Sequence, residues 1–162
     1  IAGIFKSDDI QGTERCFGLL CALRDENILS CEEHICYFDT AQLAALQTKQ
    51  DTGFLSEFAA KQLKNTTAVV CYNDEIAYWL IKEFSYKNLR IPEDISIVCF
   101  DNSYLSELSS VRITSLSHKS HEMGTTAAEA ILKLMKGSAV SPQKLTWHLA
   151  ARQSCAPPPH DI

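Results

Sequence analysis

The sequence has no apolar run of the roughly 18–20 residues that a membrane-spanning helix needs. It has no cluster of lysine and arginine, and its formal net charge is −5. Basic surfaces attract the phosphates of nucleic acids, so we do not expect this chain itself to bind DNA or RNA. It also has no segment with the pattern of a secretory signal peptide. We therefore expect a cytoplasmic location and no contact with a membrane.

The chain also lacks the motifs of common enzyme classes. Gly3 and Gly12 fit no G-x-G-x-x-G loop of the kind that cradles phosphates. No G-x-S-x-G follows a predicted strand, and Ser103 and His118 have no spacing that suggests a catalytic triad. We therefore expect no catalytic residues, no enzymatic activity and no cofactor.

The seven cysteines form an odd set without the pattern of a disulfide framework. Several, including Cys71 and Cys99, lie inside apolar patterns, where a thiol packs as a small hydrophobic group and is poorly placed as a nucleophile. We expect reduced thiols in a core. Cys31, His34 and Cys36 are the one cluster to weigh as metal ligands. No second pair stands at ligand spacing, so we expect no metal site.

What the sequence does contain is an alternation of strand and helix patterns. Its 162 residues suffice for one domain with a core, and 46% apolar and 22% charged residues exclude a disordered chain. Predicted strands lie at residues 1–5, 35–38, 69–72, 95–100, 111–116 and 145–150, and predicted helices at 13–26, 53–63, 74–86 and 119–136. Residues 39–52 are ambiguous, with 41–46 readable as a helical turn. The alternation predicts an α/β fold with a doubly wound, mostly parallel sheet, helices on both faces and right-handed crossovers.

Two predicted strands end in polar residues. The apolar run 67–72 ends in Asn73 and Asp74, whose side-chain oxygens can accept amide hydrogens of a following helix. The run 95–100 is nearly all apolar, which predicts a strand covered on both faces, and it ends in Asp101. Open α/β sheets bind ligands just past the carboxyl ends of their strands, so this edge is the candidate site.

Four segments together carry a resemblance to a known family. They are TAVVCYNDEIA (67–77), LRIPEDISIVCFDNS (89–103), ITSL (113–116) and Met123-Gly124. In this order and spacing they resemble the sugar-sensing domain of the lactose-repressor/galactose-repressor (LacI/GalR) family of bacterial transcription regulators. The opening GIFKSDDIQG (3–12), with Glu14, Arg15 and Gly18, resembles the arabinose repressor (AraR) branch. The resemblance covers roughly residues 1–155 and implies a periplasmic-binding-protein-like fold.

The resemblance also implies how the chain is divided. It predicts a C-terminal lobe of the sugar-sensing domain (1–118), a crossover helix that belongs to the other lobe in the full-length family (119–137), a returning strand (138–155) and a flexible tail (156–162). Most of the first lobe and the DNA-binding domain have no counterpart here, and the chain begins at Ile1, so we expect a fragment of a longer protein. The crossover helix is then expected to expose its apolar face, dock elsewhere or swap between copies. Cys99 stands where the family has a glycine, so packing beside Asp101 is expected to differ.

For function, the resemblance implies the effector-binding part of a transcriptional repressor. A pentose, with L-arabinose first, is expected to bind between the lobes, shift a homodimer toward its closed form and release DNA through the DNA-binding domain absent from this chain. This mechanism requires the sugar to bind the two states unequally. The alternative is a solute-binding protein of a sugar transporter, which needs an export signal and tolerates few free thiols.

Three residues are the principal ligand candidates implied by the resemblance. Arg15 is expected to fork onto sugar hydroxyls, although an exposed helix charge is the alternative. Asn73 is expected to contact the ligand while it caps its helix. Asp101 follows a buried strand and can accept two hydroxyl protons, with an Asx-turn as its alternative. We expect the three side chains to face one hollow at the same edge of the sheet.

Five further residues are weaker ligand candidates. Lys6, Asp9 and Gln11 belong to a loop over the expected cleft, and a solvated loop is their alternative. Phe38 ends the second strand, where relatives stack an aromatic ring on the ligand, but the core is an equally good place for it. His118 lies at the crossing between lobes, as either a ligand contact or a hinge histidine.

A dimer contact surface is expected on two neighbouring segments. In relatives the dimer is built partly from this lobe. The candidates are Tyr78, Trp79 and Lys82 after Asn73, and Tyr104, Leu105 and Leu108 after Asp101. Burial against the next helix is the alternative for Tyr78 and Trp79.

Overall fold

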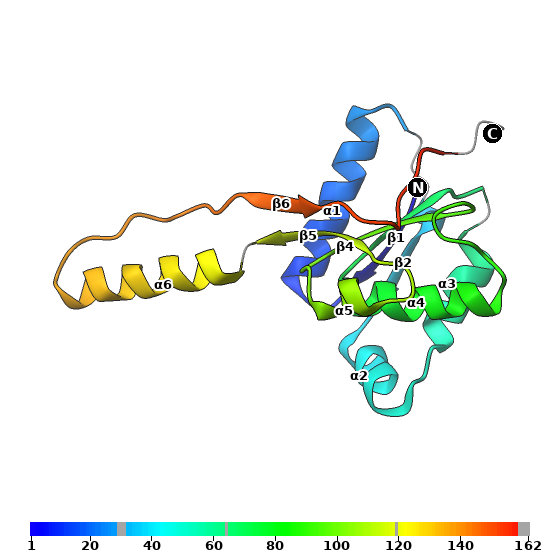
Figure 1. Ribbon diagram of the computed structural model, residues 1–162, viewed down its shortest axis with the longest axis horizontal. Coiled ribbons are helices and arrows are strands. Elements are labelled where there is room, and N and C mark those ends of the chain that lie inside the picture. The colour runs from blue at the N-terminus through cyan, green and yellow to red at the C-terminus, as the bar shows by residue number, and fades with distance from the viewer. Residues whose placement is uncertain (29–31, 64, 119, 159–162) are drawn as a thin grey trace.

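The computed structural model describes residues 1–28, 32–63, 65–118 and 120–158 (Figure 1). Their six-stranded sheet has the order β2-β1-β3-β4-β5-β6. The strands are β1 (Ala2–Lys6), β2 (Ile35–Phe38), β3 (Ala68–Cys71), β4 (Ser96–Phe100), β5 (Thr114–His118) and β6 (Trp147–Ala150). The first five are parallel, and β6 pairs antiparallel with β5. The prediction of a mostly parallel α/β sheet is confirmed.

Helices cover the two faces of the sheet unequally. They are α1 (Ile10–Asp25), α2 (Thr40–Lys49), α3 (Gly53–Lys61), α4 (Asp74–Tyr86), α5 (Tyr104–Leu108) and α6 (Ser120–Met135), with a short 3-10 helix at Glu32–His34. In Figure 1, α1 lies on one side of the sheet and α2 to α5 on the other. This division follows from right-handed crossovers, because the chain moves from β1 to β2 in one direction and onward to β3, β4 and β5 in the other.

Local contacts explain where three elements begin. Helix α1 begins at Ile10 rather than 13, because the Asp9 side chain accepts a hydrogen bond from the Gly12 amide and caps the helix. The ambiguous stretch is helix α2, whose start is fixed by a capping box between Asp39 and Gln42. Strand β5 begins at Thr114 rather than 111, since the Ile113 amide donates to the carbonyl of Ser106 instead of to a strand.

The core lies between the sheet and the helices α2 to α4. Val69, Cys71, Ile97 and Cys99 point to this side of β3 and β4 and are fully buried. The alternating residues Val70, Val98, Phe100 and Leu116 are only half-buried. The prediction that strand 95–100 is covered on both faces is therefore wrong. An apolar run in the sequence fits both a strand buried on two faces and a strand whose second face is only partly covered by one helix.

An arm formed by α6, the segment 136–146 and β6 projects from the body of the fold (Figure 1). Its apolar residues are largely exposed, including Met123, Ile131, Leu134 and Met135 at 48%, 58%, 59% and 78%. This exposure agrees with an apolar face that lacks a partner within the described residues. The division of the chain into lobe, crossover helix, returning strand and tail stays a prediction.

Six cysteines of the described residues are free thiols, and their burial differs. Cys16, Cys71 and Cys99 are buried and free, whereas Cys155 is free and exposed, so not all thiols lie in the core. Cys31 lies outside the described residues. Within the described ranges no group of three or more His, Cys, Asp or Glu side chains could hold a metal ion, and none of the helices there is long and apolar enough to cross a membrane.

Candidate ligand-binding site

The centre of the candidate site is an ion pair between α1 and the end of β4. Arg15 Nη2 donates to Asp101 Oδ1 at 2.8 Å, and Arg15 Nη1 donates to the Tyr72 carbonyl at 2.5 Å. The Arg15 side chain is 11% exposed, whereas that of Asp101 is 46% exposed. The pair therefore joins three distant parts of the chain and leaves one carboxylate open to a ligand.

Two aromatic rings at the ends of neighbouring strands lie against the Arg15 guanidinium. Its Cζ atom lies 4.9 Å from the centroid of the Tyr72 ring and 4.7 Å from that of Phe100. Each contact contributes about 0.5–1 kcal/mol at a partly exposed site and fixes the plane of the guanidinium. The sequence analysis missed both rings. The sequence feature that marks them is their position at a strand end, where Tyr72 precedes Asn73 and Phe100 precedes Asp101.

A second polar group links the opening loop to the same strand end. Tyr72 Oη donates to Asp9 Oδ2 at 2.6 Å, and Lys6 Nζ lies 2.9 Å from Asp8 and 3.5 Å from Asp9. Burial, together with the hydrogen bond to Asp9, raises the pKa of Tyr72 to about 12. Burial alone would raise the pKa of Asp9, but the hydrogen bonds from Tyr72 and the Gly12 amide, with Lys6 nearby, hold it below its usual value. Tyr72 is therefore a neutral donor to an ionised Asp9.

Gly12 allows this loop to close over the end of β1. A Cβ atom at this position would lie 1.9 Å from the carbonyl oxygen of Lys6, which no side chain can tolerate. The first turn of α1 thus packs directly on the β1 backbone.

A cavity of about 860 Å³ opens beside the ion pair. Gln11, Glu14, Arg15 and Asp101 form its polar end, and α1, the half-buried sheet face and the arm supply the rest. Its other lining residues are Gly18, Leu19, Val70, Val98, Phe100, Leu116, Met123 and Trp147. The arrangement joins hydrogen-bonding groups to apolar walls, as small-molecule sites do.

The structure places the other predicted ligand residues differently. Asn73 does not line the cavity, and its Oδ1 accepts the Ile76 amide as the N-cap of α4 at 3.0 Å. Phe38 is 1% exposed and packs against Phe54 and edge-on against Tyr72. The backbone of His118 belongs to β5, but its side chain lies outside the described part of the chain. Ligand contact by any of the eight candidates stays a prediction.

The turn after β4 has an unusual backbone. Asp101 has φ +91° and Asn102 has φ +50°. Positive φ at a residue other than glycine costs on the order of 1–3 kcal/mol and persists only where neighbouring groups hold it. The Asp101 amide donates to the Leu116 carbonyl at 2.8 Å, and the Asn102 amide donates to Ser115 Oγ at 3.0 Å. The sheet thus holds the turn that presents the Asp101 carboxylate to Arg15.

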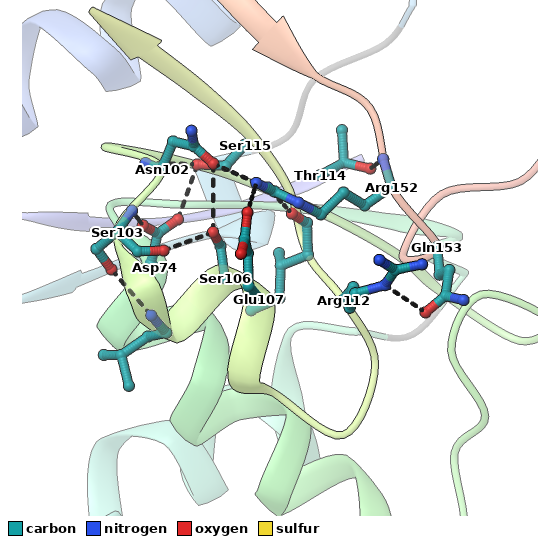
Figure 2. A network of polar contacts seen from close by, with 12 residues as sticks. Asp74, Asn102, Ser103, Ser106, Glu107, Arg112, Thr114, Ser115, Arg152 and Gln153 are labelled. Carbon is teal, nitrogen blue, oxygen red and sulfur yellow. Dashed lines mark hydrogen bonds and ion pairs between the residues drawn. The ribbon is translucent and has the colours of Figure 1, made fainter. Parts of the chain in front are cut away.

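Asp74 anchors the same turn from beneath (Figure 2). It is 1% exposed, and it accepts hydrogen bonds from Ser115 Oγ at 2.7 Å, from Cys99 Sγ at 2.8 Å and from the Ser103 amide. Burial and the charge of Asp74 raise the pKa of the Cys99 thiol well above its usual value. Cys99 is therefore a protonated donor, and its thiol fills the space beside the Asp101 turn.

The candidate dimer residues lie on α4 and α5. Lys82 Nζ lies 4.8 Å from the Tyr78 ring and 4.5 Å from the Trp79 ring, and both rings are half-buried. On α5, Tyr104 is 70% and Leu108 75% exposed, and Leu105 is half-buried. Whether these side chains meet a second copy stays a prediction.

The fold and the site together define an α/β ligand-binding domain whose pocket lies at the carboxyl edge of a parallel sheet. Residues 3–155 match the periplasmic binding protein-like domain family, and the chain belongs to that family. The fold class predicted from the sequence is thereby confirmed.

Relatives of known type share this domain. The chain is 35% identical over 136 residues to the arabinose metabolism transcriptional repressor of Halalkalibacterium halodurans, a match that covers 84% of this chain and 35% of the relative. It is 32% identical over 140 residues to the repressor of the same name from Geobacillus stearothermophilus, covering 86% of this chain and 38% of the relative. The solved structure of the Escherichia coli transcriptional repressor ascG aligns with a TM-score of 0.80 at 21% identity, over 96% of this chain and 55% of that one.

The chain therefore spans less than two fifths of the length of these curated relatives. All three proteins are named as transcriptional repressors. The resemblance to the effector-binding region of the LacI/GalR-type transcription regulators is confirmed.

Proposed function

We propose that this chain is the effector-binding part of a cytoplasmic, sugar-responsive transcriptional repressor, and that its effector is a pentose such as L-arabinose. The observation that carries the proposal is the Arg15–Asp101 pair at the open end of the cavity. The names of two relatives that match more than four fifths of the chain support the choice of arabinose.

The chemistry of the pair suits an uncharged polyol. Arg15 retains donor hydrogens beyond the two that its protein partners occupy, and the exposed carboxylate of Asp101 accepts hydroxyl protons. Because the two charges neutralise each other, a ligand rich in hydroxyl groups gains hydrogen bonds without bringing a charge of its own. The aromatic and aliphatic walls beside the pair suit the weakly apolar face of a sugar ring.

In the complete repressor we expect the sugar to bind between this lobe and another. Closure around the sugar would change the geometry of a homodimer through the α4 and α5 surface and release the operator DNA. The DNA-binding domain is not part of this chain. Sugar shifts the equilibrium only as far as it binds the closed state better than the open one.

A chimera tests the proposal. Residues 1–155 replace the matching region of the Geobacillus stearothermophilus relative, and operator binding is measured with L-arabinose, with other pentoses and with hexoses. We expect L-arabinose to release the operator from the chimera, and Arg15→Met to abolish the release. Arg24→Met is the matched control, because Arg24 lies on the same helix and its side chain is 74% exposed. If the chimera binds its operator and no sugar releases it, the proposal is wrong.

A further inference from the structure

Arg152 lies on the segment that leaves β6 and returns to the body of the fold. Its side chain is only 13% exposed, although it carries a charge. Nη1 donates to the Ile113 carbonyl at 2.8 Å, and Nη2 donates to Asn102 Oδ1 at 2.6 Å and to Glu107 Oε1 at 3.1 Å. A side chain fifty positions away in the sequence from Asn102 is thus tied to the turn after β4.

Figure 2 shows where these contacts converge. In this view the Arg152 guanidinium approaches Asn102 from the right, Ser115 lies beside Asn102, and Ser106 and Asp74 lie below it. Asn102 Oδ1 accepts from Arg152 at 2.6 Å and from Ser106 Oγ at 3.3 Å. Arg152 therefore supplies the shorter, charge-assisted bond of the two that hold this amide, which makes it the stronger one.

The turn held in this way is the one that aims Asp101. Asp101 precedes Asn102, and both have positive φ. If Asn102 is released, the backbone at Asp101 can return to negative φ, and the carboxylate then swings away from Arg15. Asp101 lines the cavity, whereas Arg152, which contacts the residue after it, does not.

We propose that Arg152 is a positioning residue of the ligand site, acting on Asp101 through Asn102. As far as the ligand is concerned, this inference rests on the proposed function. Arg152 makes the returning segment 151–154 part of the site, although no residue of that segment lines the cavity. Through Glu107 it also connects the Asp101 turn to α5, which carries part of the predicted dimer surface.

The geometry requires arginine at this position. Its acceptors lie on three different elements: the residue before β5, the turn after β4, and α5. The planar fork of a guanidinium reaches them with two nitrogens, whereas the single ammonium of a lysine reaches only part of the set. We expect Arg152→Lys to restore little of what Arg152→Met removes.

The first test needs no sugar. The one-bond Cα–Hα coupling of Asp101, measured by NMR, separates positive from negative φ. We expect the coupling of Asp101 to have a value typical of negative φ in Arg152→Met and a value typical of positive φ in Arg112→Met. Arg112 is the matched control, because it is an exposed arginine beside the network whose Nε donates to Gln153 Oε1 at 3.5 Å and, within the described residues, to no group of the Asp101 turn. An unchanged Asp101 coupling in a folded Arg152→Met protein would refute the positioning role, whether or not any sugar binds.

The second test uses sugar and a double-mutant cycle. Asn102→Gly permits positive φ but removes the side-chain oxygen that accepts from Arg152 Nη2, and the acceptors at Ile113 and Glu107 remain. In the sugar-responsive chimera we expect Arg152→Met to weaken L-arabinose binding at least about tenfold, the equivalent of one lost charge-assisted hydrogen bond. Asn102→Gly should weaken it similarly, and the double variant should be little worse than either single variant. Full additivity would show that Arg152 does not act through Asn102, and failure of the parent chimera to bind sugar would count against the proposed function alone.

Discussion

The hydrogen bond from Tyr72 to Asp9 gives a sharp test of how the opening loop is held. Tyr72→Phe removes one hydroxyl and leaves the ring beside Arg15 in place. Hydrogen bonds to charged groups contribute about 1.5–3 kcal/mol. Asp9 keeps its bond from the Gly12 amide at 2.6 Å, and its side chain is 28% exposed, so water replaces part of the loss. We expect the variant to lose about 1.5 kcal/mol of unfolding free energy near neutral pH.

The same bond predicts the effect of alkaline pH. The pKa of Tyr72 is raised from 10.0 to about 12 in the folded protein, so the folded state holds this proton more tightly than the unfolded chain does. The resulting stabilisation is complete below the unfolded pKa and is lost as the pH rises through the folded pKa. The loss between about pH 10 and 12 is on the order of 2 kcal/mol. Phenylalanine has no such proton, so the difference in unfolding free energy between wild type and Tyr72→Phe should shrink as the pH rises.

Urea denaturation followed by circular dichroism at a series of pH values measures both effects. Tyr86→Phe is the matched control, because Tyr86 is 81% exposed and should show no difference from wild type at any pH. Two results would refute this account of the Tyr72–Asp9 contact. One is an equal unfolding free energy of wild type and Tyr72→Phe at neutral pH, and the other is a difference in unfolding free energy that stays constant up to about pH 11.

Other predictions concern α1, the ion pair and the arm. In urea denaturation, Gly12→Ala should lower the free energy of unfolding by about 3 kcal/mol or more, because the new Cβ meets the Lys6 backbone. Gly18→Ala should raise it by up to about 1 kcal/mol, because no atom lies within 4 Å of the new Cβ. Equal effects of the two variants would contradict the packing of α1 on β1. Arg15→Lys should lower the free energy of unfolding by about 1–2 kcal/mol, since a lysine ammonium beside the two rings cannot keep both hydrogen bonds, to the Tyr72 carbonyl and to Asp101. Ile131→Ser should change unfolding free energy by less than about 0.5 kcal/mol, because Ile131 is 58% exposed; a larger loss would show that α6 is packed. Calorimetry should find that the isolated chain binds L-arabinose weakly or undetectably, because in the proposed two-lobed cleft this chain supplies one wall; tight binding would show that this lobe suffices.

Much of the fold was predictable because each element carries its own local signal. The runs that end in Asn73 and Asp101 identify β3, β4 and the edge where the ion pair lies. The short helix α5 was missed because five residues are too few to show a helical period. The start of α1 was misplaced because the cap at Asp9 looks like an ordinary loop aspartate until the Gly12 amide is seen to donate to it.

The candidate site was only partly predictable, and the limit is physical. Arg15 and Asp101 could be paired in advance through the resemblance and the rule about carboxyl ends of strands. Tyr72 and Phe100 could not, since an aromatic residue at the end of an apolar strand reads equally well as core. Arg152 lies fifty residues from Asn102 in the chain, and no periodicity or spacing relates two residues that meet only after the sheet has formed.

The antiparallel pairing of β6 with β5 has a consequence for how such a domain can evolve. Adjacent antiparallel strands can be joined by a turn of any length, so everything between residues 118 and 147 is, in topological terms, an insertion at the tip of a hairpin. Such an insertion can lengthen, shrink or acquire a new partner while the strand order of the sheet stays the same. A domain of this design can therefore gain or lose a structural unit at that position without a change in the strand order of its sheet.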